Sequence, residues 1–125
     1  MITPVFRIFD LQKTKEFYVD WLGFAIDWEH RFEEHFPVYL QVSKEGVILH
    51  LSEHHGDCCP GGKVIINRPD LHSYCRELTA KNYKYYKPAV EEAPWGSWTL
   101  EVIDPFGNKI VFSEAKAEGS IVNGD

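Results

Sequence analysis

Residues 94–114 read PWGSWTLEVIDPFGNKIVFSE, and this stretch predicts a β-hairpin. Two runs rich in β-branched and aromatic residues, 98–103 and 109–113, flank the turn DPFGN at 104–108. Proline presets the backbone for entry into a turn, and glycine supplies the positive φ that a tight reversal needs. Strands of this composition around such a turn are typical of a hairpin. Trp95, just before the hairpin, is either a cap on the edge of the core or part of a cleft wall.

Length, composition and charge limit the class of protein. With 125 residues, 44% of them hydrophobic, the chain can fold as one domain around a core. The formal net charge of -6 disfavours a nucleic-acid partner, which would need a basic surface. No apolar run approaches the ~20 residues that span a bilayer, so we expect no membrane insertion. Three cysteines do not make a disulfide framework, and together with an N-terminus that lacks a signal-peptide pattern they favour the cytoplasm.

The first half of the chain predicts the element order β, α, β, β, β. An apolar run at 4–9 predicts the first strand. Asp10 is placed to cap the start of a helix. The apolar stripe of this helix ends at Gly23, and glycine is a typical residue at the C-terminus of a helix. Three further strands are predicted at 24–29, 37–43 and 47–52.

The second half predicts the same order after a polar, glycine-rich connector at 53–62. A short strand at 63–66 precedes Asp70, which heads a second helical stripe that ends near Asn82. A strand at 85–90 and the hairpin complete the set.

The two halves therefore predict a structural repeat, inferred from element order rather than from sequence identity. A βαβββ unit leaves one face of its sheet bare, so two units are expected to cooperate in enclosing a site. We expect a single domain over residues 1–115, with modules at about 1–55 and 60–115. A flexible polar tail is predicted for residues 116–125.

Five short motifs occur in order along the chain: Asp10-Leu11, Phe17-Tyr18, Trp21-Leu22-Gly23-Phe24, Pro94-Trp95-Gly96 and Asp104-Pro105-Phe106-Gly107-Asn108. With these motifs the chain resembles the glyoxalase/bleomycin-resistance superfamily, also called vicinal oxygen chelate proteins, over residues 4–114. The tripeptide at 94–96 ahead of the Asp-Pro turn resembles its bleomycin-resistance branch most. The resemblance implies an α+β fold in which two βαβββ modules form a cupped eight-stranded mixed sheet. It also implies a homodimer, with modules paired across chains and clefts at the interface.

The resemblance also implies where a metal would bind. Enzymes of the superfamily hold a divalent metal with four side chains, and the matching positions here are Thr3, His50, Lys63 and Val111. Threonine seldom ligates such metals, a lysine cation would repel one, and valine has no donor atom. A catalytic metal site generally needs three protein ligands, so we predict no metal and no cofactor. The alternative is a metal-dependent lyase, isomerase or dioxygenase that uses His50 with ligands placed elsewhere.

The connector after His50 offers a second set of metal-ligand types. These are His50 itself with Glu53, His54, His55, Asp57, Cys58 and Cys59. Adjacent pairs cannot easily direct both side chains at one tetrahedral centre, and no CxxC or HxxxH spacing is present. We therefore interpret it as a solvated connector, with adventitious metal binding together with His50 left open.

Aromatic side chains provide the remaining candidate site. The predicted ligand-binding residues are Trp28, Phe32, Phe36, His50, Trp95 and Trp98. Flat rings can hold a planar cation by stacking and cation–π attraction, worth about 0.5–2 kcal/mol per contact. The alternative for several of these rings is packing in the core or at the dimer interface.

We therefore predict a non-enzymatic protein, with no catalytic residues, that sequesters a bulky aromatic or cationic small molecule. The resistance proteins of the family act in this way, and the acidic balance, including Glu33, Glu34 and Asp57, suits a cationic ligand. Besides the metal-dependent enzyme, a structural dimer whose cleft is filled by side chains remains an alternative.

Overall fold

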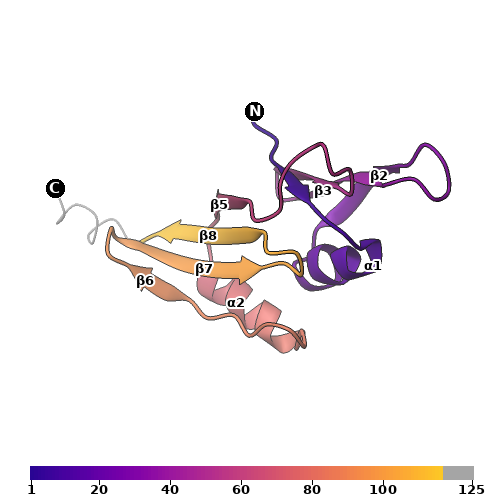
Figure 1. The fold of residues 1–125 in the computed structure, drawn as a ribbon. Helices are drawn as coiled ribbons and strands as arrows, with labels where there is room; N and C mark the ends of the chain where they lie inside the picture. Colours follow the sequence, from indigo (N-terminus) through magenta and orange to yellow (C-terminus); the bar gives the residue numbers. More distant parts are fainter. Residues whose placement is uncertain (117–125) are drawn as a thin grey trace. The chain divides into compact units, whose positions relative to one another are not determined.

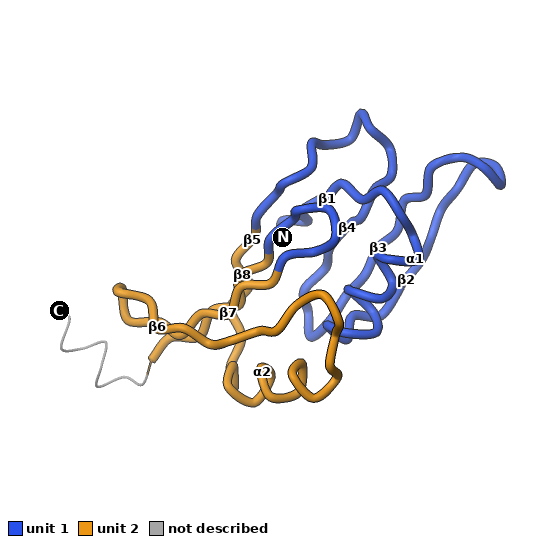
Figure 2. The backbone as a smooth tube through the Cα atoms, turned by 60° about the horizontal axis from the view of Figure 1, so that its bottom comes forward, with its two compact units in different colours: residues 1–63, 103–109 blue, residues 64–102, 110–125 orange. Residues whose placement is uncertain are grey.

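The computed structural model describes residues 1–116, drawn in Figure 1 with their elements labelled. The chain divides into two compact units, coloured blue and orange in Figure 2. Unit 1 comprises Met1–Lys63 and Ile103–Lys109, and unit 2 comprises residues 64–102 with the described residues from Ile110 onward. The predicted tail, apart from Lys116, lies outside the described residues.

Across residues 1–116, no helix combines the length and the apolar character that crossing a membrane would require.

Unit 1 has the predicted βαβββ order. Its sheet has the order β1-β4-β3-β2, in which β1 runs parallel to β4 and the other pairs are antiparallel. Leu40, Val42, Leu49 and Leu51 point to one face and are buried, while the residues between them point to the other face. The elements are β1 (Val5–Arg7), α1 (Leu11–Thr14), η1 (Lys15–Trp21), β2 (Ala25–His30), β3 (Tyr39–Lys44) and β4 (Val47–Ser52).

The helix of unit 1 begins and ends as its sequence predicts. The carboxylate of Asp10 accepts a hydrogen bond from the backbone N–H of Lys13 at 2.9 Å, which satisfies one orphan donor at the helix start. The α-helix then widens into the π-helix η1, and the N–H of Leu22 donates to the carbonyl of Phe17, five residues earlier, at 2.9 Å. Gly23 follows with a φ of 89°, which ends the helix.

Unit 2 repeats the order β, α, β, β, β, so the predicted fold of two βαβββ modules is confirmed. Its sheet has the order β5-β8-β7-β6. Helix α2 packs on this sheet, with the ring of Tyr74 edge-on to that of Phe112 at 5.2 Å. The eight strands thus form two four-stranded sheets. The elements are β5 (Lys63–Asn67), α2 (Leu71–Ala80), β6 (Glu91–Ala93), β7 (Ser97–Ile103) and β8 (Lys109–Ala115).

The strand predicted at 85–90 is wrong, because the sheet partner of β7 is instead Glu91–Ala93. Pro88 has no N–H to give to a ladder, which disfavours a strand across that segment. The phenol of Tyr86 donates to the backbone carbonyl of Glu101 at 2.8 Å. The aromatic residues of segment 85–90 therefore gave the composition of a strand without strand pairing.

Asp70 heads α2 as predicted, but the cap comes from elsewhere in the chain. Its backbone φ is 55°, and its side chain does not cap the helix. Instead, the carboxylate of Glu114 accepts from the backbone N–H groups of Asp70 and Leu71, at 2.9 and 3.0 Å. A carboxylate at this end also complements the helix dipole.

The turn between β7 and β8 is built around the carboxylate of Asp104, which is 4% exposed. Its Oδ1 accepts from the backbone N–H groups of Phe106 and Asn108 at 2.9 and 2.8 Å. Its Oδ2 accepts from the Tyr18 hydroxyl at 2.7 Å and from the Asn108 amide at 2.9 Å. Burial raises the pKa of Asp104 although these bonds oppose the change, and burial next to Asp104 raises the pKa of Tyr18.

Asn108 extends the same network to two other parts of unit 1. Its Nδ2 donates to the carbonyl of Arg7 at 2.7 Å, and its Oδ1 accepts from the N–H groups of Gly61 and Gly62 at 3.2 and 3.1 Å. A Cβ at Gly62 would lie 3.0 Å from the Phe6 ring, so any larger residue would require this ring to shift. The turn therefore holds the first strand, the helix and the connector in place.

We expect Tyr18→Phe to lower the free energy of unfolding by about 1.5–3 kcal/mol, because it leaves a buried carboxylate oxygen with one donor fewer. Urea denaturation followed by circular dichroism measures the change. Tyr85→Phe is the matched control, since Tyr85 is 61% exposed, and it should stay within about 0.5 kcal/mol of the parent. Equal stabilities for the two variants would show that the Tyr18–Asp104 bond does not stabilise the fold.

Candidate functional site

A β-bulge in β2 shapes the open face of the unit 1 sheet. The register between β2 and β3 shifts between Ile26 and Trp28, so Asp27 is the extra residue. The Asp27 carboxylate reaches across to β3, where it accepts from the Gln41 amide and from the Ser43 hydroxyl, both at 3.0 Å. The bulge breaks the strict alternation of side chains, so Asp27 and its neighbour Trp28 both contact residues of the open face.

Three rings on β2, β3 and β4 form an aromatic wall on this face. The indole of Trp28 is stacked parallel to the ring of Tyr39, with centroids 5.9 Å apart and planes at 10°. The imidazole of His50 meets both rings edge-on, at 5.4 Å from Trp28 and 5.2 Å from Tyr39. Trp28 remains 42% exposed. Two neighbours therefore fix the indole while a large part of it stays open to a ligand.

Both nitrogens of His50 are hydrogen-bonded within the protein. Its Nδ1 lies 2.7 Å from the Tyr39 hydroxyl, and its Nε2 lies 2.9 Å from the Oε1 of Gln41. The Gln41 amide nitrogen faces Asp27, whose carboxylate can only accept, so the amide oxygen must face His50. It follows that Nε2 carries the proton and that Nδ1 accepts from Tyr39. Burial raises the pKa of Tyr39, with smaller effects of Asp57 and Cys58, so the phenol keeps its proton.

The resemblance implies four metal positions, at Thr3, His50, Lys63 and Val111, and their side chains do not form a donor set for a divalent cation. His50 uses both nitrogens in hydrogen bonds, Lys63 is a cation, and Val111 has no donor atom. Within residues 1–116, no group of three or more His, Cys, Asp and Glu side chains is arranged to hold a metal ion.

The connector contacts the end of β4. The carboxylate of Asp57 accepts from the Ser52 hydroxyl at 2.5 Å, and this hydroxyl accepts from the N–H of His54 at 3.0 Å. Burial raises the pKa of the Cys58 thiol, so it is a poorer nucleophile than an ordinary thiol at neutral pH. Cys58, Cys59 and Cys75 are all free thiols.

The two phenylalanines predicted in the site lie on the segment between β2 and β3. Phe32 is 73% exposed and contacts the His30 ring edge-on at 4.9 Å. Phe36 is half-exposed and lines a pocket of unit 1 with Arg31. The structure thus brings Trp28 and His50 together, whereas Phe32 and Phe36 lie outside the aromatic wall.

The two predicted tryptophans of unit 2 have different surroundings. Trp95 occupies the tip of the β6–β7 hairpin and is 75% exposed, in a turn closed by a 3.1 Å bond from the Gly96 N–H to the Ala93 carbonyl. Trp98 lies on β7, where its ring contacts His72 of α2 at 5.1 Å and the Lys116 ammonium at 4.8 Å.

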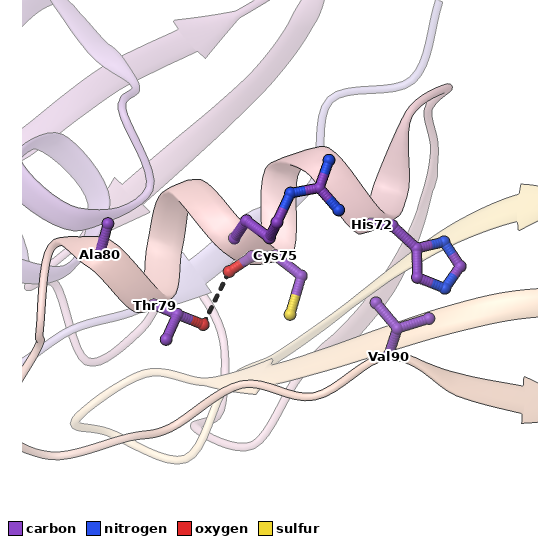
Figure 3. Close-up of a pocket in the computed structure, with 6 residues that line it drawn as sticks. His72, Cys75, Thr79, Ala80 and Val90 are labelled. Carbon is purple, nitrogen blue, oxygen red and sulfur yellow. Dashed lines mark hydrogen bonds between the residues drawn. The ribbon is translucent and has the colours of Figure 1, made fainter.

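Unit 2 has a pocket of its own beside α2 (Figure 3), with a volume of about 480 Å³. Its wall consists of His72, Cys75, Arg76, Thr79, Ala80 and Val90. The Thr79 hydroxyl donates to the Cys75 carbonyl at 2.8 Å, and the Cys75 thiol faces the Pro88 carbonyl at 3.7 Å. The Thr79 hydroxyl and the Cys75 thiol therefore interact with backbone carbonyls and stabilise the wall of the pocket.

Sequence reasoning missed Asp27, Tyr39 and Gln41. The alternation of residues 39–43 does carry a signal for two of them, because Tyr39 and Gln41 share a strand face opposite the buried Leu40 and Val42. Nothing in the local sequence marks the bulge at Asp27.

The family model described as "glyoxalase superfamily protein" matches residues 1–119. The chain belongs to the glyoxalase superfamily. No curated protein matches this glyoxalase superfamily protein.

Several solved structures share its fold. A glyoxalase/bleomycin resistance protein from Streptomyces sp. CB03234 is 26% identical, with a TM-score of 0.64 over 89% of this chain and 98% of the other. An antibiotic-binding protein from the same organism is 25% identical, with a TM-score of 0.66 over 93% and 97%. A bleomycin-binding protein in complex with bleomycin is 20% identical, with a TM-score of 0.69 over 93% and 98%, and this likeness shows the fold alone.

We expect His50 to be the Nε2–H tautomer at pH 8, because Asp27 orients the Gln41 amide and thereby fixes the proton. Nitrogen chemical shifts of ¹⁵N-histidine-labelled protein distinguish the two ring nitrogens. Gln41→Ala should raise the Nδ1–H population of His50. His72, whose ring contacts Trp98, serves as the internal reference. A predominant Nδ1–H form in the parent protein would contradict this assignment.

Proposed function

We propose that this glyoxalase superfamily protein binds and holds a flat aromatic small molecule on the open face of the unit 1 sheet, without changing it chemically. One observation carries the proposal: the indole of Trp28 is half-exposed yet fixed between Tyr39 and His50. A ring that is already ordered loses little freedom when a ligand stacks on it, so more of the contact energy appears as affinity.

A cationic ligand is favoured by the charge of the protein. The formal net charge is -6, and the Asp27 carboxylate stands beside Trp28 on the open face. A cation over an indole gains about 0.5–2 kcal/mol, and an acidic protein raises the local concentration of a cationic ligand. Two proteins of similar fold, one that binds an antibiotic and one in complex with bleomycin, support a small-molecule ligand.

The proposal extends to the assembly of the protein and to its cellular setting. We propose a homodimer with modules paired across chains, as the resemblance to the bleomycin-resistance branch implies. A reducing cytoplasm is supported by the three free thiols. All six sequence-predicted ligand contacts stay predictions: Trp28, Phe32, Phe36, His50, Trp95 and Trp98.

Titration with metal-free bleomycin, a cationic glycopeptide, tests the binding function. We expect bleomycin to quench tryptophan fluorescence in a saturable way, and calorimetry should give the same affinity. The bleomycin recovered after the titration should be chemically unchanged. Trp28→Ala should weaken binding about tenfold or more, since a stacked cation–π contact contributes up to about 2 kcal/mol. Trp95→Ala should also weaken binding if the sequence-based prediction for Trp95 holds.

Tyr85→Ala is the matched control, because Tyr85 is an exposed aromatic ring that belongs to unit 2 and not to the unit 1 sheet. It should bind bleomycin like the parent. The absence of quenching at millimolar bleomycin would remove the glycopeptide assignment, and equal affinities for the parent and Trp28→Ala would remove the aromatic wall as the binding surface.

A further inference from the structure

Unit 1 contains a second candidate site, a pocket of about 360 Å³ at the end of β1. The segment between β2 and β3 and the first residue after β4 complete its wall. The lining residues that matter for its chemistry are Arg7, Phe9, Arg31, His35, Phe36 and Glu53. None of them belongs to the aromatic wall of Trp28, Tyr39 and His50.

The guanidinium of Arg7 is held in position by apolar and backbone contacts. It lies over the Phe9 ring, 4.4 Å from the centroid, and Phe9 in turn contacts the Phe106 ring at 5.9 Å. Its Nε donates to the Ile8 carbonyl at 3.4 Å. Both Nη groups keep their N–H donors available, because Arg7 makes no ion pair within the described part of the chain.

Arg31 is fixed from the opposite segment of the wall. Its Nη1 donates to the backbone carbonyl of Phe36 at 2.7 Å and to that of Glu34 at 3.3 Å. These acceptors are neutral, so the charge of the guanidinium is not cancelled, and residues 1–116 provide no carboxylate partner for it. Its Nη2 and Nε remain as donors for a ligand.

The wall of this pocket contains little negative charge, and its carboxylate already accepts a hydrogen bond from the backbone. Glu53 is the acidic residue that lines the pocket, and its Oε1 accepts from the backbone N–H of Val38 at 2.9 Å. The wall of the pocket therefore contains two guanidinium groups and one carboxylate, in a protein whose formal net charge is -6. Arginine forks of this kind suit the bidentate recognition of a planar anion.

The apolar part of the wall defines the rest of the ligand. Phe36 is 46% exposed, and Ile8 and Pro37 lie in the same wall. A flat ring can stack on the open face of Phe36 while its anionic group reaches the two arginines.

We propose that this pocket binds a small aromatic carboxylate, with its anionic group between Arg7 and Arg31 and its ring against Phe36. The ligand is opposite in charge to the cation proposed for the aromatic wall. The two sites therefore select different molecules, and one can fail without the other.

Benzoate and its neutral isostere benzamide test this proposal on the full chain. In ¹H–¹⁵N spectra of the labelled protein, benzoate should shift the resonances of Arg31, Phe36 and Arg7 with a Kd of about 1 mM, which is reasonable for so few atoms. Benzamide should bind at least about tenfold more weakly, because it keeps the ring and loses the charge. Phenyl phosphate is included to show whether the arginine pair prefers a larger anion.

Variants then locate the site. Arg31→Ala and Arg7→Ala should each weaken benzoate binding about tenfold, and Arg31→Lys should restore only part of the loss because it keeps the charge without the fork. Arg76→Ala removes an arginine from the wall of the unit 2 pocket and should leave the affinity unchanged. Trp28→Ala should also leave it unchanged, which separates this result from the test of the aromatic wall.

Equal binding of benzoate and benzamide, or unchanged benzoate affinity in both Arg7→Ala and Arg31→Ala, would overturn the proposal. No shift of these resonances at about 10 mM benzoate would overturn it as well, because that concentration is about tenfold above the expected Kd. The comparison of the two probes uses the parent protein, so it does not depend on whether a variant folds.

Discussion

The buried carboxylate of Asp104 is the constraint on which unit 1 depends. It accepts four hydrogen bonds, two from the backbone of its own turn and two from the side chains of Tyr18 and Asn108. Removing water from a charged group is costly unless its lone pairs are satisfied, and here every partner comes from the protein. Residues far apart in the chain must therefore be positioned together for these hydrogen bonds to form. The DPFGN turn reverses the chain and also binds the first strand, the helix and the connector of unit 1.

This arrangement lets the unit 1 sheet use its two faces differently. One face, with Leu40, Val42, Leu49 and Leu51, is buried and belongs to the core. The other carries Trp28, Tyr39 and His50, with Gln41 and Asp27 fixing the orientation of the histidine. In a βαβββ module the helix can cover only one face, so the open face is where aromatic and polar side chains can serve a ligand.

The sequence predicted most of what local chemistry decides. The turn at 104–108, the cap at Asp10, the end of the helix at Gly23 and the repeated βαβββ order follow from residues that are close together in the chain. Partners distant in sequence decide the rest. Glu114 caps α2 from a strand, and Glu91–Ala93 pair with β7 in place of the aromatic run at 85–90.

The candidate site divides in the same way. Trp28 was singled out as an aromatic residue and His50 through the family resemblance, and the structure brings their rings into contact. The side-chain network behind them depends on the bulge at Asp27, which shifts the register between two strands and leaves no local mark. The sequence also did not predict the pocket at Arg7 and Arg31. The net charge of the protein is negative, and the two arginines are 24 positions apart (31 minus 7).

We propose that this glyoxalase superfamily protein acts by holding a ligand and not through a bound metal. Titration of the protein with Co²⁺, followed by visible absorption, tests it most directly, because a protein-bound cobalt ion with histidine or carboxylate ligands absorbs in a way that the free ion does not. The account predicts no saturable absorption at one equivalent, in the parent and in His50→Ala alike. A stoichiometric band in the parent that His50→Ala abolishes would contradict it.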